Sequence, residues 1–456
     1  MRRDRGAALT QAELAERLGI SQCDVSKLER RRDVRLSTLR DDTAAWAPGC
    51  AWWPRHATAR STSTSRAERR DRFAAVRVAV PAEVLPGERR VAVTPETAAQ
   101  LVGAGLEVVV QAGAGRHASL PDQAYAHAGA VVVEAVEAGE VDVLLHVRPL
   151  HPKLPARLKA GAITIGLCSP STEPATVEAL RDAGVTSFAL ELVPRISRAQ
   201  SMDALSSQAL VAGYRCVLEA ATRLPRFFPL FMTAAGTVPP ARVLVLGAGV
   251  AGLQAIATAK RLGAKVFGYD VRPASADEVR SMGATFVELD LEALEGAGGY
   301  AREMSEDRGT RQRELLAPHV ADADVVITTA AVPGRAAPLL VTAEMVAAMK
   351  AGSVVADLAA ESGGNVEGSV PGEDVSVATA DGGTATLVGM ADAASTMPVD
   401  ASRLYAKNAA TLLLLMTSEG SVVPDFDDEV VAGACLTHDG VIRHEPTREQ
   451  IEGGES

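Results

Sequence analysis

The sequence predicts an α/β protein with two Rossmann-like domains on parallel, doubly wound sheets, preceded by a short helical or disordered N-terminal extension. Short apolar strands alternate with helical segments from Arg77 onward, and a glycine-rich turn joins a strand to a helix at Gly247. The character of the chain also changes near residue 76. Of the 456 residues, 47% are apolar and 23% are charged, which is ordinary for a globular protein and excludes a disordered chain.

The first strand-and-helix unit begins with the apolar run after Arg77. Thr94 can cap a helix that ends at Gly103 and Gly105. Further apolar strands are expected at 106–110, 141–147 and 162–167. Strands that alternate with helices of this length indicate βαβ units and a parallel sheet.

The second unit begins with a strand at 241–246 that runs directly into Gly247, Gly249 and Gly252. A helix follows, and then a second strand that ends at Asp270. The first glycine allows a tight turn, the second lets the backbone approach a pyrophosphate, and the third lets the helix pack on the strand. The N-terminus of that helix then faces the anion.

Asp270 lies where a carboxylate accepts hydrogen bonds from both hydroxyls of the adenosine ribose and repels a 2′-phosphate. We therefore expect NAD rather than NADP on this chain. Arg272 does not change this expectation, since an arginine that binds a 2′-phosphate normally replaces the acid.

Two more strands are expected at 324–328 and 353–357, with their carboxyl ends bordering the dinucleotide crevice. Between them and Asp270, residues 296–312 break the rhythm with a Gly-Gly pair and a polar body. We interpret this stretch as a mobile surface loop that carries Tyr300 and Met304.

The N-terminal 75 residues are a different kind of sequence. They hold 16 Lys and Arg against 10 Asp and Glu, whereas the remainder holds 30 against 47. Residues 9–32 (LTQAELAERLGISQCDVSKLERRR) resemble a Cro/repressor-type helix-turn-helix, with Gln22, Asp24 and Lys27 on its recognition helix. The pattern fades by Leu39. We therefore interpret residues 1–45 as a helix-turn-helix-like fragment and 46–75 as a disordered linker.

Composition argues against nucleic-acid binding, a metal site and a membrane-spanning or secreted chain. The acidic body opposes affinity for DNA, so a nucleic-acid partner is not expected. The five cysteines form no CxxC pair, and no metal site is predicted. The chain has neither a signal-peptide core nor an apolar run near the roughly 18–20 residues that span a bilayer, so a soluble intracellular chain is expected.

Three stretches carry a family resemblance: PRISRAQSMDALSSQ (194–208), VLVLGAGVAGLQAIATAKRLGAKVFGYDVRP (243–273) and DLAAESGGN (357–365). They resemble domain I, the NAD(H)-binding alpha component, of the proton-translocating NAD(P) transhydrogenases. This family is related to the alanine dehydrogenases. ERRVAVTP, TTAAVPGR and RLYAKN add support, and the resemblance covers about residues 76–445.

The resemblance implies a nicotinamide site on the PRISRAQSMD loop. Arg195 and Asp203 would fix the loop, Gln200 would reach toward the partner's nucleotide, and Ser206 would hydrogen-bond the carboxamide region. Tyr300 would fold over the adenosine. Other nucleotide contacts implied by the family are Ser201, Met202, Val250, Val271, Arg272, Gly299, Gln312, Thr329 and Ala331.

The resemblance also implies the reaction and the assembly. Hydride would pass directly between NADH here and NADP⁺ on a partner domain, with Re/Si specificity and coupling to proton translocation. No general acid or base is needed, so proximity and orientation carry the catalysis. The implied assembly is a homodimer at the cytoplasmic face of the inner membrane, bound to NADP-binding and membrane-spanning subunits.

The implied domain organisation is discontinuous. The first domain takes residues 76–205 and recovers 393–456, while 206–392 form the NAD(H)-binding domain between them. Two positions depart from the family pattern. Ala331 stands where a larger aliphatic residue is usual, and Thr396 replaces an expected arginine.

Two alternatives remain open. An alanine dehydrogenase would hold a substrate carboxylate on Arg90 but needs a histidine where this chain has Cys168 and Ser169. His146 and His151 are interpreted as surface histidines at a strand end. The other alternative is an NAD-sensing DNA-binding regulator, which would require a complete helix-turn-helix.

Overall fold

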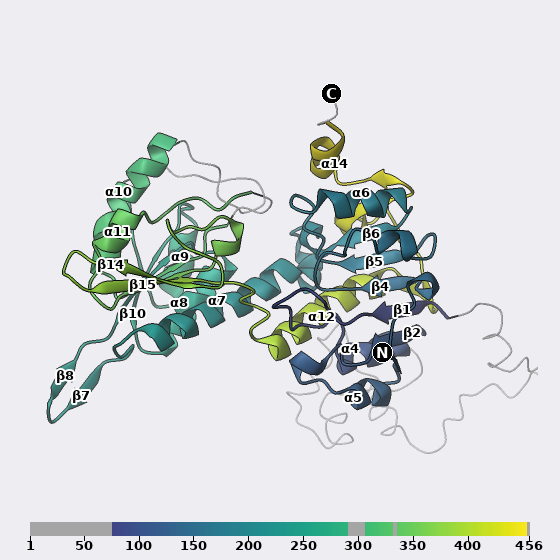
Figure 1. Ribbon diagram of the computed structural model, residues 1–456, viewed down its shortest axis with the longest axis horizontal. Helices are drawn as coiled ribbons and strands as arrows, with labels where there is room; N and C mark the ends of the chain where they lie inside the picture. The colour runs from purple at the N-terminus through teal and green to yellow at the C-terminus, as the bar shows by residue number, and fades with distance from the viewer. Residues whose placement is uncertain (1–74, 291–305, 332–334, 454–456) are drawn as a thin grey trace, which may run out of the picture. The chain divides into compact units, whose positions relative to one another are not determined.

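The computed structural model describes residues 75–290, 306–331 and 335–453. The helix-turn-helix-like fragment, most of the predicted mobile loop, Gly299 and Tyr300 lie outside these ranges. In the described part of the chain, strands gather into two large sheets (Figure 1). None of the helices described there is long and apolar enough to cross a bilayer.

The first sheet has the order β3-β2-β1-β4-β5-β6-β18-β19. Its strands are β1 (Arg77–Val80), β2 (Glu107–Gln111), β3 (Val131–Val133), β4 (Val143–Leu145), β5 (Ile163–Gly166), β6 (Thr186–Ala189), β18 (Cys435–His438) and β19 (Val441–Ile442). The first six are parallel, whereas β18 pairs antiparallel with β6. The C-terminal hairpin of β18 and β19 thus extends the parallel sheet by an antiparallel edge, which the sequence analysis did not predict.

The second sheet has the order β11-β10-β9-β12-β13-β15-β14. Its strands are β9 (Arg242–Leu246), β10 (Lys265–Tyr269), β11 (Thr285–Phe286), β12 (Val325–Thr328), β13 (Val354–Asp357), β14 (Asp374–Ala378) and β15 (Thr384–Gly389). All neighbours are parallel except β14, an antiparallel edge strand. In both sheets the chain winds outward from the first strand on either side, which is the doubly wound order of Rossmann-like folds.

Helices connect the strands. They are α4 (Pro95–Gly103), α5 (Asp122–His127), α6 (Pro174–Asp182), α7 (Ala204–Arg223), α8 (Val250–Arg261), α9 (Ser275–Ser281), α10 (Glu306–Asp322), α11 (Ala343–Ala347), α12 (Pro398–Leu415), α13 (Glu429–Ala434) and α14 (Glu445–Glu452). Thr94 caps α4 as predicted, in a capping box with Thr97. α10 begins at Glu306, inside the predicted loop 296–312, which is a correction to that loop's extent.

The second sheet buries both faces. Val243 and Val245 of β9 pack in one core with Ile256 of α8, while Leu244 packs on the other side with Leu316 of α10. Side chains alternate between faces along a strand, so a strand covered on both sides reads as a continuous apolar run. This is why RVLVL carries no polar alternation.

Helix α7 lies against α8 at a point where the two backbones nearly touch. A Cβ at Gly213 would overlap the carbonyl oxygen of Ala251, the second residue of α8. Glycine at this position fixes the spacing of the two helices. The N-terminal half of α7 therefore has a defined position relative to the glycine turn.

A two-stranded hairpin, β7 (Phe231–Thr233) and β8 (Gly236–Val238), extends away from the second sheet (Figure 1). Its apolar side chains are unusually exposed, with Met232 76% accessible. Phe231 packs edge-on against Phe227, with ring centroids 4.6 Å apart. The sequence reasoning did not identify this hairpin.

We expect Gly213→Ala to destabilise the fold by about 1–3 kcal/mol, since the added methyl must separate α7 from α8. Urea unfolding of the full chain measures this difference. Gly103→Ala is the matched control, because outside its own helix no described residue has an atom within 4 Å of a Cβ there. Equal free energies of unfolding for the two variants would contradict the close-approach argument.

Candidate functional site

The glycine turn stands at the carboxyl end of β9, between β10 and β12. Gly247 has φ +101, a backbone conformation that favours glycine. A Cβ at Gly252 would overlap the Gly247 carbonyl oxygen, so only glycine lets α8 begin this close to the strand. Gly249 is the N-cap of α8 and is exposed, and no described residue beyond its chain neighbours has an atom within 4 Å of where its Cβ would be. Space is therefore open in front of the first turn of α8.

Asp270 locks this turn to the neighbouring strand. Its carboxylate accepts a hydrogen bond from the Ala248 backbone N–H at 2.7 Å, and it also accepts from the backbone and guanidinium of Arg272 at 2.9 Å. The side chain is nearly buried. The acid and the arginine that sequence reasoning considered as separate selectivity elements thus form one ion pair.

The ends of two other elements meet the same turn. The Thr329 hydroxyl, just past β12, donates to the Gly247 carbonyl oxygen at 3.1 Å, and the exposed Ala331 follows it. Val271 is partly buried beside the sheet core. Gln312 on α10 is buried and donates to the hydroxyl of Tyr269 at 3.2 Å. Since Tyr269 is the last residue of β10, this hydrogen bond attaches α10 to the end of that strand.

The loop DLAAESGGN is built around a buried carboxylate. Asp357 accepts hydrogen bonds from the Thr328 hydroxyl at 2.9 Å and from the backbone N–H groups of Ala359 and Asn365 at 3.0 Å. The Asn365 amide then donates to the carbonyl oxygens of Ala330 and Pro338, both at 2.8 Å. This motif therefore shapes the chain that borders the glycine turn.

The PRISRAQSMD loop leads into α7 through a short 3-10 helix, η6 (Ser197–Met202). Arg195 of the loop and Gln200 and Ser201 of η6 are exposed, whereas the side chain of Met202 is buried in the core of the first sheet. Met202 stays a predicted nucleotide contact, and its side chain belongs to this core.

Asp203 is the N-cap of α7, which starts at Ala204. The Asp203 carboxylate accepts from the Ser206 backbone N–H at 2.8 Å and from the Ser206 hydroxyl at 2.6 Å. The two residues assigned to loop and carboxamide roles thus form one cap. In this arrangement the Ser206 hydroxyl proton is committed to Asp203, while its oxygen can still accept a hydrogen bond.

A buried charge cluster, which the sequence reasoning largely missed, lies near the start of α7. Arg90 is 5% exposed and donates to the Glu88 carboxylate at 2.6 Å and to the Gln208 amide oxygen at 2.9 Å. Arg148 pairs with Glu88 at 2.8 Å and also with Asp392. Despite burial, the two arginines lower the pKa of Glu88 to about 2. The sequence signal is the run of charged residues that follows Gly87, from Glu88 to Arg90.

Glu83 and His146 border this cluster. The Glu83 carboxylate accepts from the Val147 backbone N–H at 2.6 Å, yet burial raises its pKa to about 7. His146 is buried, and burial lowers its pKa to about 4. The prediction of a surface histidine is therefore wrong for His146, because its ring lies against Gly166, where a Cβ would overlap it. His151 is exposed as predicted.

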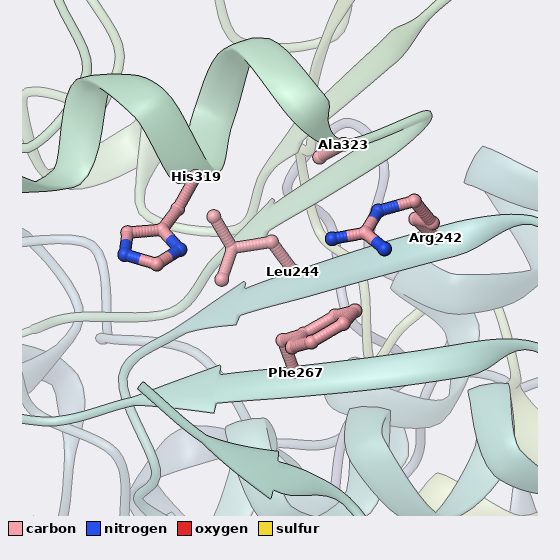
Figure 2. A pocket seen from close by; sticks show the side chains of 5 residues that line it. All are labelled: Arg242, Leu244, Phe267, His319 and Ala323. Carbon is pink, nitrogen blue, oxygen red and sulfur yellow. The ribbon is translucent and has the colours of Figure 1, made fainter. Parts of the chain in front are cut away.

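One small cavity lies elsewhere, against β9, β10 and α10. Figure 2 shows its lining by Arg242, Leu244, Phe267, His319 and Ala323. Its volume of about 10 Å³ admits one water molecule but no nucleotide. Arg242 begins β9, so this cavity is distant from the glycine turn at the other end of that strand. Within the described ranges, no group of three or more His, Cys, Asp or Glu side chains could hold a metal ion.

Comparisons with known proteins agree with this arrangement. Residues 79–212 match the family described as alanine dehydrogenase/PNT, N-terminal domain, and residues 216–445 match its C-terminal domain. An NAD(P) transhydrogenase subunit alpha polypeptide of Rhodospirillum rubrum is 46% identical over 81% of this chain and 98% of its own length. An alanine dehydrogenase of Mycolicibacterium smegmatis is 30% identical over 82% of this chain and 96% of its own.

A solved structure is also similar. The crystal structure of transhydrogenase from Sinorhizobium meliloti aligns with a TM-score of 0.71 at 44% identity, covering 81% of this chain and 99% of that one. The predicted α/β fold with Rossmann-like sheets and the predicted family resemblance are confirmed. The individual site residues stay predictions.

We expect Gly249→Ala to weaken NADH binding roughly tenfold or more, because its methyl would fill the space before α8 that a pyrophosphate needs. The free energy of unfolding should stay within about 0.5 kcal/mol of wild type. Isothermal titration and urea unfolding measure the two quantities. Gly252→Ala is the contrasting variant, since its methyl meets the chain's own carbonyl and should cost about 1–3 kcal/mol of stability. Unchanged NADH affinity in Gly249→Ala would argue against this site.

We expect Glu83 to make the fold less stable as pH rises. Because its folded pKa is about 7 against an ordinary 4.5, the folded chain keeps a proton that the unfolded chain releases, and stability falls between about pH 4.5 and 7. Glu83→Gln should remove up to about 3 kcal/mol of this loss. Urea unfolding at pH 5 and pH 8 measures it, with the exposed Glu134→Gln as control. An unchanged pH slope in Glu83→Gln would refute the assignment.

Proposed function

This chain belongs to the alanine dehydrogenase/PNT family, and we propose that it is the NAD(H)-binding component of a proton-translocating NAD(P) transhydrogenase. The carrying observation is the glycine turn at the point where the second sheet changes winding direction, locked there by Asp270. Ligands of doubly wound sheets bind at this place. The open space before Gly249 and the N-terminus of α8 suit a pyrophosphate.

We infer NAD(H), rather than NADP(H), as the nucleotide on this chain. The nearly buried Asp270 carboxylate can accept from the ribose hydroxyls after Arg272 yields part of its contact, and it would repel a 2′-phosphate. The NADP(H) nucleotide then belongs to a partner domain. Val250, Val271, Thr329 and Ala331 border the same turn and would complete the adenosine side.

The nicotinamide end would lie on η6 and the start of α7. Because Gly213 of α7 touches Ala251 of α8, the segment from Ser206 to Gly213 spans about 10 Å along the helix axis. The nicotinamide half of an extended dinucleotide can bridge that interval. Exposed Gln200 would then face outward toward a partner's nucleotide, while Arg195 and Asp203 would fix the loop.

When NADH is bound, its dihydronicotinamide supplies a hydride directly to NADP⁺ on the partner, with Re/Si specificity. The protein's contribution is placement rather than proton transfer. Cys168, which replaces the histidine of alanine dehydrogenases, has a pKa raised well above its usual value by burial. His146 is neutral at pH 7 and buried. Neither of these two side chains therefore exchanges a proton near pH 7.

The proposed assembly is a homodimer bound to NADP-binding and membrane-spanning subunits at the cytoplasmic face of the membrane, with hydride transfer coupled to proton translocation. The exposed apolar hairpin β7–β8 supports a subunit contact, since monomers rarely leave an apolar cluster such as Phe231 and Met232 in water. The discontinuous domain boundaries at 205, 392 and 393 stay a prediction.

We expect hydride exchange from NADH to an NADP⁺ analogue only when this chain is mixed with an NADP-binding partner domain. Stopped-flow absorbance of the analogue measures the rate. Gln200→Asn should lower it about 10- to 100-fold, since a shorter side chain no longer reaches the partner's nucleotide. NADH production from NAD⁺ and alanine by the chain alone would instead identify an alanine dehydrogenase.

A further inference from the structure

Asn408, on the face of α12 that packs against η6 and α7, has no role in the proposed nucleotide contacts. Its side chain is 6% exposed. The amide nitrogen donates to the Ser201 carbonyl oxygen at 2.8 Å, and the amide oxygen accepts from the Ser207 hydroxyl at 2.7 Å. One buried amide therefore joins the exposed nicotinamide loop to the first turn of α7.

This contact is the last of a directional series of hydrogen bonds. Arg90 donates to the Gln208 amide oxygen at 2.9 Å, and the Gln208 amide nitrogen donates to the Ser207 hydroxyl at 3.1 Å. Ser207 then donates to Asn408, which donates to Ser201. Because an arginine only donates and a carbonyl only accepts, both ends of the series are fixed and each amide has one possible orientation.

The loop has a second attachment on the C-terminal segment. The Arg198 guanidinium binds the two oxygens of Asp428 at 2.8 and 2.9 Å, and it contacts Glu429 at 3.3 Å. Asp428 is the N-cap of α13 and also accepts from the Val430 backbone N–H at 2.7 Å. Two-pronged binding to a residue held in place restricts the loop more than a single exposed ion pair.

We propose that Asn408 is a positioning residue for hydride transfer, holding the loop of Gln200 and Ser201 in place from the returning C-terminal segment, with Arg198 and Asp428 as a second anchor. The inference rests on the proposed function. Ser201 adjoins Gln200 in the chain, so a displaced Ser201 carbonyl moves the side chain that faces the partner. A displacement near 1 Å lowers rates by up to about 100-fold in reactions that depend on orientation.

The test is Asn408→Asp in the full chain. The carboxylate still accepts from Ser207 but repels the Ser201 carbonyl oxygen, because it has no donor to offer. We expect the exchange rate with the NADP-binding partner domain to fall roughly 10- to 100-fold. The dissociation constant of ADP-ribose, which lacks nicotinamide, should change less than about twofold, because the glycine turn holds that half. The exposed neighbour Lys407→Gln is the matched control and should match wild type.

Arg198→Gln is the second variant, since its exposed side chain can be changed without burying a charge. We expect a several-fold lower exchange rate with unchanged ADP-ribose affinity. Wild-type exchange rates in both variants would overturn the proposal. A purely structural role would also overturn it, and its sign would be that Asn408→Asp loses ADP-ribose affinity and free energy of unfolding along with its exchange rate.

A partner-free measurement separates this proposal from the proposed function. If the wild-type chain binds NADH but never exchanges hydride, the transhydrogenase assignment fails. The emission maximum of bound NADH still reports the nicotinamide environment in that case. Asn408→Asp should shift it toward that of free NADH while Lys407→Gln leaves it unchanged. An unshifted maximum in Asn408→Asp would overturn the positioning role.

Discussion

The arrangement of the second sheet and its helices depends on a backbone contact that leaves no room for a side chain. Gly252 lies so close to the Gly247 carbonyl that a methyl group would overlap it. That contact sets where α8 begins relative to β9, and therefore where its unpaired N–H groups point. Gly213 makes a second close contact of this kind, with the Ala251 carbonyl oxygen, and this contact holds α7 near the same turn. The N-terminus of α8 and the proposed nicotinamide loop are thus held near each other by close backbone contacts at two glycines.

Buried carboxylates organise the loops around that contact. Asp270 fixes the glycine turn from β10, and Asp357 fixes the chain after β13 with hydrogen bonds from backbone N–H groups. A buried charge costs free energy unless it is paired or hydrogen-bonded, and both acids are fully engaged. Backbone donors leave these carboxylates little freedom, so these hydrogen bonds define the shapes of the loops.

The first domain uses buried charges differently. Glu88, Arg90 and Arg148 form an ion-pair cluster that continues to Asp392 and, through Gln208, to α7. Such clusters add little net stability because desolvation offsets attraction, but they are specific about geometry. Tyr405 adds a neutral counterpart, since its buried hydroxyl donates to the His146 carbonyl oxygen at 2.7 Å. Segments far apart in the sequence are held in register by these contacts.

The sequence itself determined the helix start at Thr94 and the glycine turn, because each depends only on residues close to it in the chain. Thr94 predicted a helix start because a cap acts on the next three residues, and the glycine spacing predicted the turn because each glycine acts on its own backbone. The family motifs predicted which segments carry the candidate site. Sequence alone could not predict that His146 is buried, that Met202 faces a core, or that Asp203 caps Ser206. Nor could it place Asn408 beside Ser201, 207 positions earlier. These depend on which distant segments share a sheet edge or helix face, and only the packed tertiary structure decides that.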